Sequence, residues 1–305
     1  MIFNTRDQDD SMILVTGLSG FTGRHLAERL RARGARVVGL SNSGQGEGEI
    51  ACDLTDAVAV RNVIAELRPT HVAHLVAISF VGHGNPRAFY DVNVFGTLNL
   101  LEALAALPKP PRKILITSSA NIYGSPSVEV IDESVCPAPV NHYACSKLAM
   151  EHMVHTWFDR LPIVMTRPFN YTGVGQDEKF LIPKIVSHFR RRAPFIELGN
   201  LDVSRDFSDV RDVAGIYAAL LLDVVGGEGE TYNVCSGRAY SLREILQIVS
   251  NISEFSMELR VNPDLMRANE ITLLRGSNDL LRDRTGLAPQ IPLRETLRWM
   301  LRAEA

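Results

Sequence analysis

Short apolar runs and longer segments of mixed apolar and polar residues follow one another through the first half of the chain. The short runs predict buried strands, and the longer segments, whose apolar residues recur every three or four positions, predict amphipathic helices. Strands are expected at residues 13–16, 37–40, 50–51, 71–77, 113–117 and 163–166. Helices are expected at residues 25–30, 56–67, 86–106 and 142–159. This alternation predicts an α/β fold with a doubly wound parallel sheet.

The pattern changes after Arg167-Pro168, where the spacing is less regular and proline and glycine are more frequent. Helical patterns return, with short strands between them that include 231–234, at residues 179–192, 210–224, 241–252 and 292–303. We therefore expect a larger domain and a smaller C-terminal α/β lobe. Their expected bounds are 12–169 with 211–235 for the larger domain, and 170–210 with 236–305 for the lobe.

The composition is typical of a globular enzyme, with 46% apolar and 22% charged residues and a formal net charge of −3. This charge gives no electrostatic basis for binding nucleic acid or a membrane surface. No apolar run approaches the ~20 residues of a membrane span and no signal peptide is evident, so a cytoplasmic location is expected. The four cysteines and eight histidines show no zinc or redox spacing, so no metal is expected. Residues 1–11, which precede Met12, are expected to form a disordered leader.

A glycine-rich turn follows the first predicted strand. The segment Gly17-Leu-Ser-Gly20-Phe-Thr-Gly23 connects residues 13–16 to the helical pattern at 25–30. Glycines let the backbone approach a pyrophosphate closely, and the first turn of a helix offers amide donors and the positive end of the helix dipole. Strand, glycine-rich turn and helix in this order predict a Rossmann-type dinucleotide-binding site in the larger domain.

A tyrosine and a lysine lie four residues apart in Tyr143-Ala-Cys-Ser-Lys147. On a helix this spacing places both side chains on one face, and an ammonium group beside a phenol favours the ionised phenol. Ser119 follows the strand predicted at 113–117, at the carboxyl end where open α/β sheets place their chemistry. We interpret Ser119, Tyr143 and Lys147 as catalytic. The structural alternatives are a capping serine and a surface Tyr–Lys pair at ordinary helical spacing.

From Met12 onward, the chain resembles the extended short-chain dehydrogenase/reductase superfamily. The motifs that support the resemblance are TGLSGFTG at 16–23, CDLTD at 52–56, HLVAIS at 74–79, NVFGT at 93–97, SSANIYG at 118–124, YACSK at 143–147 and RPFNYTG at 167–173. Within the superfamily, the chain is similar to the branch that acts on GDP-mannose derivatives. That similarity rests on SRDFSDVRD at 204–212, YNVCSG at 232–237, NPDLMRANE at 262–270, and GSN at 276–278 with RTG at 284–286.

The resemblance implies a role for each catalytic residue. Tyr143 would protonate a carbonyl oxygen as hydride arrives, Lys147 would lower the pKa of that phenol and bond the nicotinamide ribose, and Ser119 would hold the substrate oxygen. Related sugar-nucleotide dehydratases have an acidic residue two positions after the catalytic Ser or Thr, where this chain has Asn121. An amide does not act as a base, so carbonyl reduction is expected rather than dehydration. The lack of an acidic residue at position 121 does not exclude 4-epimerisation.

The resemblance also implies a set of cofactor contacts. The pyrophosphate would be bound by Gly17, Ser19, Gly20, Phe21, Thr22 and Gly23. The adenine would meet Asp53 and Leu54, and the path to the nicotinamide would be lined by Leu75, Val76 and Ala77. The set is completed by Asn93, Tyr143, Lys147 and Arg167. Asn93 would support Lys147 through a backbone or water contact, with a helix-packing amide as the alternative.

Ser41 and Asn42 follow the second predicted strand, where an NAD enzyme usually offers Asp or Glu to the ribose hydroxyls. Without that carboxylate there is no repulsion against a 2′-phosphate, to which Ser41, Asn42 and Arg24 could form hydrogen bonds. We therefore expect NADPH in preference to NADH.

The resemblance implies a GDP-linked sugar substrate, bound by Ser119, Asn170, Phe180, Lys184, Arg205, Arg267 and Glu270. Arg205 and Arg267 would bind the diphosphate, because a planar guanidinium suits phosphate oxygens. Glu270 would take the ribose hydroxyls. The alternative for Arg205 is an ion pair with Asp206 or Asp209.

The implied function is the NADPH-dependent reduction of the 4-keto group of GDP-4-keto-6-deoxy-D-mannose to GDP-D-rhamnose by a homodimer. Reduction from the opposite face, which would give GDP-6-deoxy-D-talose, remains an alternative. A 4-epimerase or reductase of a UDP- or dTDP-linked sugar is another. A non-catalytic NAD(P)-sensing protein is the most distant one, since such a protein has no need of Ser119, Tyr143 and Lys147 together.

Overall fold

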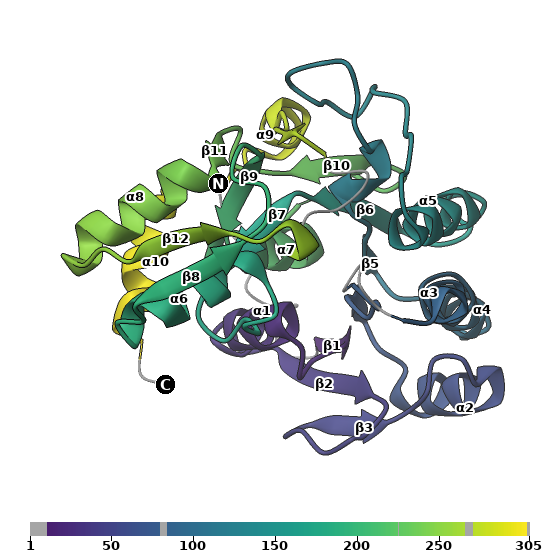
Figure 1. The fold of residues 1–305 in the computed structure, drawn as a ribbon. Coiled ribbons are helices and arrows are strands. Elements are labelled where there is room, and N and C mark those ends of the chain that lie inside the picture. Colours follow the sequence, from purple (N-terminus) through teal and green to yellow (C-terminus); the bar gives the residue numbers. More distant parts are fainter. Residues whose placement is uncertain (1–10, 80–83, 225, 266–270, 304–305) are drawn as a thin grey trace. The chain divides into compact units, whose positions relative to one another are not determined.

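The structure of the protein, a computed structural model, describes residues 11–79, 84–224, 226–265 and 271–303 (Figure 1). The chain divides into two compact units. The first consists of Met1–Ile122, Pro139–Arg167 and Ala214–Tyr232, and the second of Tyr123–Ala138, Pro168–Val213 and Asn233–Ala305. Residues 123–138, which the sequence analysis assigned to the larger domain, thus belong to the second unit. Residues 1–10 of the expected leader lie outside the described residues.

In the described part of the chain, the first unit is built on a seven-stranded sheet in the order β10-β6-β5-β4-β1-β2-β3. The strands are β1 (Met12–Thr16), β2 (Arg36–Ser41), β3 (Glu49–Ala51), β4 (His71–His74), β5 (Lys113–Thr117), β6 (Ile163–Pro168) and β10 (Thr231–Val234), the last of which lies at the boundary between the units. The pairings from β3 through β6 are all parallel. The strand order reverses between β1 and β4, the switch point at which such sheets bind ligands. The predicted doubly wound parallel fold is confirmed.

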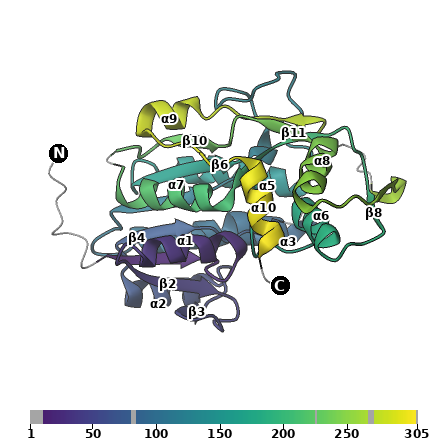
Figure 2. The same ribbon diagram turned by 90° about the vertical axis from the view of Figure 1, so that its left-hand side faces the viewer.

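Helices cover both faces of this sheet (Figures 1 and 2). One face is covered by α1 (Phe21–Arg31) and α7 (Val210–Leu222), and the other by α2 (Ala57–Leu67), α4 (Thr97–Ala105) and α5 (His142–His155). A π-helical turn, Asp91–Gly96, connects α3 (Pro86–Tyr90) to α4. Within the described ranges, no helix is long and apolar enough to cross a membrane.

Local sequence sets the ends of α2. The side chain of Asp56 accepts hydrogen bonds from the backbone N–H groups of Val58 and Ala59, two donors that the first turn of a helix leaves without partners. At the other end Arg68 has a φ of 48°, a left-handed conformation that stops the helix before Pro69.

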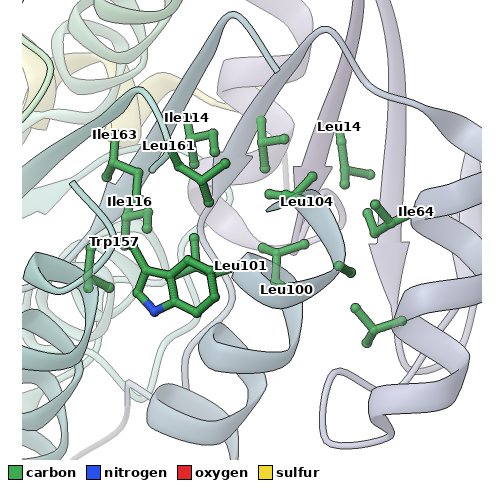
Figure 3. Close-up of a cluster of buried hydrophobic side chains, with 14 of the residues drawn as sticks. Leu14, Ile64, Leu100, Leu101, Leu104, Ile114, Ile116, Trp157, Leu161 and Ile163 are labelled. Carbon is green, nitrogen blue, oxygen red and sulfur yellow. The ribbon is translucent and has the colours of Figure 1, made fainter. Parts of the chain in front are cut away.

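The main hydrophobic core of the first unit lies between the sheet and helices α2, α4 and α5 (Figure 3). Leu14 and Ile114 from the strands, Leu100 and Leu104 from α4, and Trp157 after α5 are among its buried members. Each fully buried large apolar side chain stabilises the fold by about 1.5–3 kcal/mol. This packing fixes the strands whose carboxyl ends position the candidate site.

The second unit contains two small sheets and three helices that pack on one another, within the residues that the structure describes. One sheet has the strand order β11-β9-β13, with β7 also paired to β9, and the other joins β8 and β12. The strands are β7 (Asn170–Thr172), β8 (Phe195–Leu198), β9 (Ser204–Asp209), β11 (Ala239–Ser241), β12 (Glu258–Val261) and β13 (Leu273–Leu274). The packed helices are α6 (Leu181–Arg190), α8 (Leu242–Ser253) and α10 (Leu293–Arg302), and α9 (Asp279–Thr285) is a shorter helix. Their apolar faces form a second core that includes Ile185, Ile245 and Leu297.

Candidate active site

The glycine-rich turn joins β1 to α1 in the way that the sequence predicted. Gly17 has a φ of +75°, which favours glycine, and a Cβ added there would lie 3.2 Å from Cγ2 of Val76. A Cβ at Gly23 would lie 2.2 Å from the carbonyl oxygen of Gly17, so only glycine lets α1 begin this close to the turn. The turn therefore brings the start of α1 close to backbone that carries no side chain. These features fit the pyrophosphate of a dinucleotide.

A carboxylate lies beside this turn that the sequence analysis did not include. Glu49, the first residue of β3, accepts hydrogen bonds from the backbone N–H of Ser19 at 2.7 Å and from the hydroxyl of Ser41 at 2.8 Å. The N–H of Gly46 also donates to it, at 3.1 Å. Burial opposes its ionisation, but these hydrogen bonds together lower the pKa of Glu49 below its ordinary value. One signal was available, since a strand at 50–51 beside the strand at 37–40 brings Glu49 next to β2.

Tyr143 and Lys147 lie one turn apart on α5, and both side chains are buried. The helix begins where predicted, because the side chain of Asn141 accepts a hydrogen bond from the N–H of Ala144 at 2.9 Å. The ammonium of Lys147 donates to the carbonyl oxygen of Thr117, the last residue of β5, at 2.8 Å. Burial lowers the pKa of Lys147 to about 8, while the nearby carboxylate of Glu151 acts in the opposite direction.

Ser119 lies two residues after the end of β5, at the start of a short 3₁₀ turn. Its hydroxyl oxygen accepts hydrogen bonds from the backbone N–H and the side-chain amide of Asn121, both at 3.2 Å. A hydroxyl has two acceptor lone pairs and one proton. These contacts therefore leave the proton of Ser119 to donate to another oxygen. The sequence analysis had used Asn121 only as a missing base.

Asn93 is fully buried in the π-helical turn before α4. Its side-chain oxygen accepts from the N–H of Ile78 at 3.0 Å, and its side-chain nitrogen donates to the hydroxyl of Ser146 at 2.9 Å. Ser146 directly precedes Lys147. Asn93 thus joins the segment after β4 to α5, and π turns of this kind are frequent at functional sites.

Arg167 forms a buried ion pair with Glu151 in the structure. Its Nη2 lies 2.6 Å and its Nε 3.0 Å from carboxylate oxygens of Glu151, and the two side chains are 9% and 2% exposed. The sequence analysis expected Arg167 to contact the cofactor and did not anticipate Glu151. The available signal was that Glu151 lies one helical turn after Lys147.

The remaining predicted cofactor residues follow the carboxyl ends of strands in the first unit. The N–H groups of Leu75 and Val76 donate to the hydroxyl of Thr16, and the carbonyl oxygen of Leu54 accepts from Asn99. The other members of this predicted set are Asn42 and Asp53 after the second and third strands, Ala77 after the fourth, and Phe21 and Thr22 at the start of α1. The first unit thus holds the whole predicted catalytic and cofactor set.

A buried histidine links three elements beneath these residues. The ring nitrogens of His74 lie 2.8 Å from the hydroxyl oxygens of Thr16 and Thr97. Burial lowers the pKa of His74 to about 3, and the charge of Lys147 adds to this effect. The ring is therefore neutral at physiological pH. No group of three or more His, Cys, Asp or Glu side chains in the described ranges could hold a metal ion.

The predicted substrate residues that the structure describes belong to the second unit, apart from Ser119. Asn170 opens β7 and donates to the carbonyl oxygen of Asp206 at 3.3 Å. Phe180 directly precedes α6, and Lys184 on that helix donates to the carbonyl oxygen of Glu197 at 2.8 Å. Arg267 and Glu270 lie outside the described residues.

Arg205 on β9 donates to the carbonyl oxygens of Ser204 and Thr272, at 3.0 and 3.4 Å. The two carboxylates that the sequence analysis considered as ion-pair partners of Arg205 accept hydrogen bonds from other groups. Asp206 accepts from Ser236 and from backbone N–H groups, and Asp209 is paired with Arg211.

Comparisons with known proteins show the family of the chain. The model of the NAD dependent epimerase/dehydratase family matches residues 13–235. The fold and the site define a dinucleotide-dependent enzyme, and the chain belongs to this family. It is 40% identical to GDP-6-deoxy-D-talose 4-dehydrogenase of Aggregatibacter actinomycetemcomitans over 87% of both chains. It is 36% identical to GDP-6-deoxy-D-mannose reductase of Pseudomonas aeruginosa over 95% of both chains.

A solved structure supports the same assignment. The structure of RMD from Pseudomonas aeruginosa complexed with NADPH has a TM-score of 0.83 and 34% identity to this chain, and the match covers 95% of this chain and 96% of the other. The expected resemblance to the extended short-chain dehydrogenase/reductases is thereby confirmed.

Proposed function

We propose that this enzyme reduces the 4-keto group of GDP-4-keto-6-deoxy-D-mannose with NAD(P)H. The observation on which this proposal chiefly rests is the buried Tyr143–Lys147 pair, with Lys147 held by the end of β5 and Ser119 two residues beyond it. The names of the relatives at 40% and 36% identity supply the GDP-linked 6-deoxyhexose.

Each catalytic residue has a separate task in this proposal. The glycine-rich turn would hold the dinucleotide, which would supply the hydride for carbon 4. Tyr143 donates its proton to the carbonyl oxygen, so that ketone, hydride and proton together give the alcohol. The charge of Lys147 stabilises the phenolate that Tyr143 becomes, and the proton of Ser119 stabilises the developing alkoxide.

Asn121 favours reduction over dehydration. A dehydratase needs a base that takes a proton from the sugar. The side-chain amide of Asn121 instead donates a hydrogen bond to the hydroxyl oxygen of Ser119. An amide in this position orients the serine and accepts no proton.

The product has two candidate configurations at carbon 4. The sequence analysis predicted GDP-D-rhamnose, and the 36% identical reductase supports that product. The 40% identical GDP-6-deoxy-D-talose 4-dehydrogenase favours GDP-6-deoxy-D-talose as the second candidate. The same residues serve both reactions, because the configuration depends only on which face of the ketone receives the hydride.

A coupled assay tests the proposal. GDP-4-keto-6-deoxy-D-mannose is generated with a GDP-mannose dehydratase, this protein is added with NADH or NADPH, and absorbance at 340 nm is followed. We expect oxidation of the cofactor, and NMR of the product then distinguishes the manno from the talo configuration. Activity only with a UDP- or dTDP-linked ketosugar would contradict the assignment of a GDP-linked substrate.

A further inference from the structure

Glu49 lies where two cofactor-binding segments of the first unit meet. Its carboxylate accepts hydrogen bonds from the backbone N–H of Ser19 in the glycine-rich turn and from the hydroxyl of Ser41, the last residue of β2. β3 pairs with β2 in parallel, with Glu49 opposite Gly39, and forms the edge of the sheet (Figure 1). The chain leaves β2 at Ser41, and the carboxylate of Glu49 at the start of β3 comes back beside the Ser41 hydroxyl.

This place is where doubly wound folds recognise the adenosine ribose. An acidic residue at the end of the second strand commonly bonds the ribose hydroxyls of NAD, and a 2′-phosphate on the same ribose distinguishes NADP. The residue after β2 in this chain is Asn42, which led to the expectation of NADPH. The structure supplies the carboxylate from β3 instead.

The charge of Glu49 is not neutralised by its hydrogen-bond partners. The three donors are two backbone N–H groups and one hydroxyl, all of them neutral. A carboxylate has about four acceptor positions, so three donors leave room for a further hydroxyl. A 2′-phosphate would bring additional negative charge beside this ionised group.

We propose that Glu49 sets the dinucleotide preference, by accepting a ribose hydroxyl of NAD(H) and repelling the 2′-phosphate of NADP(H). This proposal needs only that the protein bind a dinucleotide, and it is independent of the identity of the sugar. It assigns the opposite preference from the one expected from Ser41 and Asn42 alone.

Calorimetric titration of the full chain with NAD⁺ and with NADP⁺ tests the proposal without any turnover. We expect wild-type protein to bind NAD⁺ more tightly. The Glu49→Gln variant keeps the shape of the side chain and removes its charge. We expect it to shift the ratio of the two dissociation constants about tenfold toward NADP⁺, the size of one unit-charge repulsion at about 3 Å in a medium as polar as water.

Glu47→Gln is the matched control, because Glu47 is exposed, lies two residues away and loses the same charge. We expect this variant to leave the ratio unchanged. An equal loss of affinity for both dinucleotides in Glu49→Gln would mean that Glu49 only shapes the loop. A shift of the NAD⁺/NADP⁺ ratio in Glu47→Gln as large as that in Glu49→Gln would mean that the position of the lost charge is unimportant. Either result, or tighter binding of NADP⁺ by the wild type, would overturn the proposal.

A measurement on the wild type alone covers the case in which Glu49→Gln does not fold. Salt screens repulsion between charges, so the preference for NAD⁺ should narrow as ionic strength rises. A preference that widens with salt would contradict an electrostatic origin.

Discussion

At the scale of single residues, the candidate site combines the proposed proton donor with a buried cation. Tyr143 and Lys147 share one face of α5, and Lys147 is bonded to the carbonyl oxygen of Thr117. This hydrogen bond fixes the ammonium group without neutralising it. The charge therefore remains available to the phenol of Tyr143.

Replacing Tyr143 by Phe removes the proton donor and retains the ring. We expect the rate of ketone reduction to fall by about 10²–10⁴-fold, the usual contribution of a general acid, with dinucleotide affinity nearly unchanged. Turnover by single-cycle kinetics and affinity by calorimetry are the measurements. Tyr90→Phe is the matched control, because that hydroxyl contacts only the side chain of His142 among its described hydrogen bonds. Normal turnover in Tyr143→Phe would exclude the proposed mechanism.

The reductive rate should depend on the charge of Lys147. Burial lowers the pKa of this ammonium to about 8. As the pH rises through this value the cation is lost, and with it the charge that would stabilise the phenolate left on Tyr143. We expect kcat/KM for reduction to be highest below about pH 8 and to decline above it. A profile that stays flat to pH 10 would show that Lys147 remains charged or is not needed.

The sequence pointed to candidate residues with a characteristic local position and missed those whose contacts depend on strand pairing or helix packing. Ser119, Tyr143 and Lys147 could be predicted because each occupies a characteristic position relative to a strand or a helix turn. Glu49 reaches the end of β2 only through strand pairing, and Glu151 meets Arg167 only because α5 packs beside β6. Such contacts depend on the register and packing of neighbouring elements, which the local sequence pattern does not specify.

At the scale of elements, α5 is tied to the sheet by the Glu151–Arg167 pair. Both groups are withdrawn from water, so the loss of either side chain breaks a buried charge pair. We expect Glu151→Met or Arg167→Met alone to lower the free energy of unfolding by about 3–5 kcal/mol. Replacing both residues by methionine should lower the free energy of unfolding much less, because the double variant buries no charge.

Denaturant unfolding of the two single variants and the double variant measures this coupling. Asp202→Asn, which breaks the exposed contact with Arg243, serves as the control and should change little. Additive losses in the double variant would mean that the two side chains act independently.

The helices could be predicted more completely than the strands. Amphipathic spacing placed α2, α5, α6, α8 and α10 within a few residues of their observed bounds. In the second unit, strands such as β11 and β13 have only two or three residues and are partly exposed, so they show little alternation. Their pairing with β9 spans more than 30 residues of sequence, which no local pattern encodes.

At the scale of the whole molecule, buried neutral histidines make the fold sensitive to acid. Burial lowers the pKa of His74 to about 3 and of His71 to about 4, well below the value of about 6.5 in an unfolded chain. Between the native pKa of each histidine and the unfolded value of about 6.5, the unfolded chain binds more protons than the native state. Stability should therefore be fully present above pH 6.5 and decline as the pH falls, by up to about 1.4 kcal/mol per pH unit for each histidine.

Urea unfolding measured from pH 7.5 to pH 4 tests this expectation. The exposed His152 provides the control, since His152→Asn should leave the slope unchanged. A free energy of unfolding that does not change between pH 7 and pH 5 would show that these rings are protonated in the native state.

The chain passes repeatedly between the two units, and this path constrains how the enzyme can be diversified. β9 comes from Pro168–Val213, but its partners β11 and β13 come from Asn233–Ala305. A recombination event that exchanged only the earlier segment with a relative would separate β9 from the strands with which it evolved. The second unit is therefore more easily altered by point changes, or by exchanging both segments together, than by transplanting one contiguous segment.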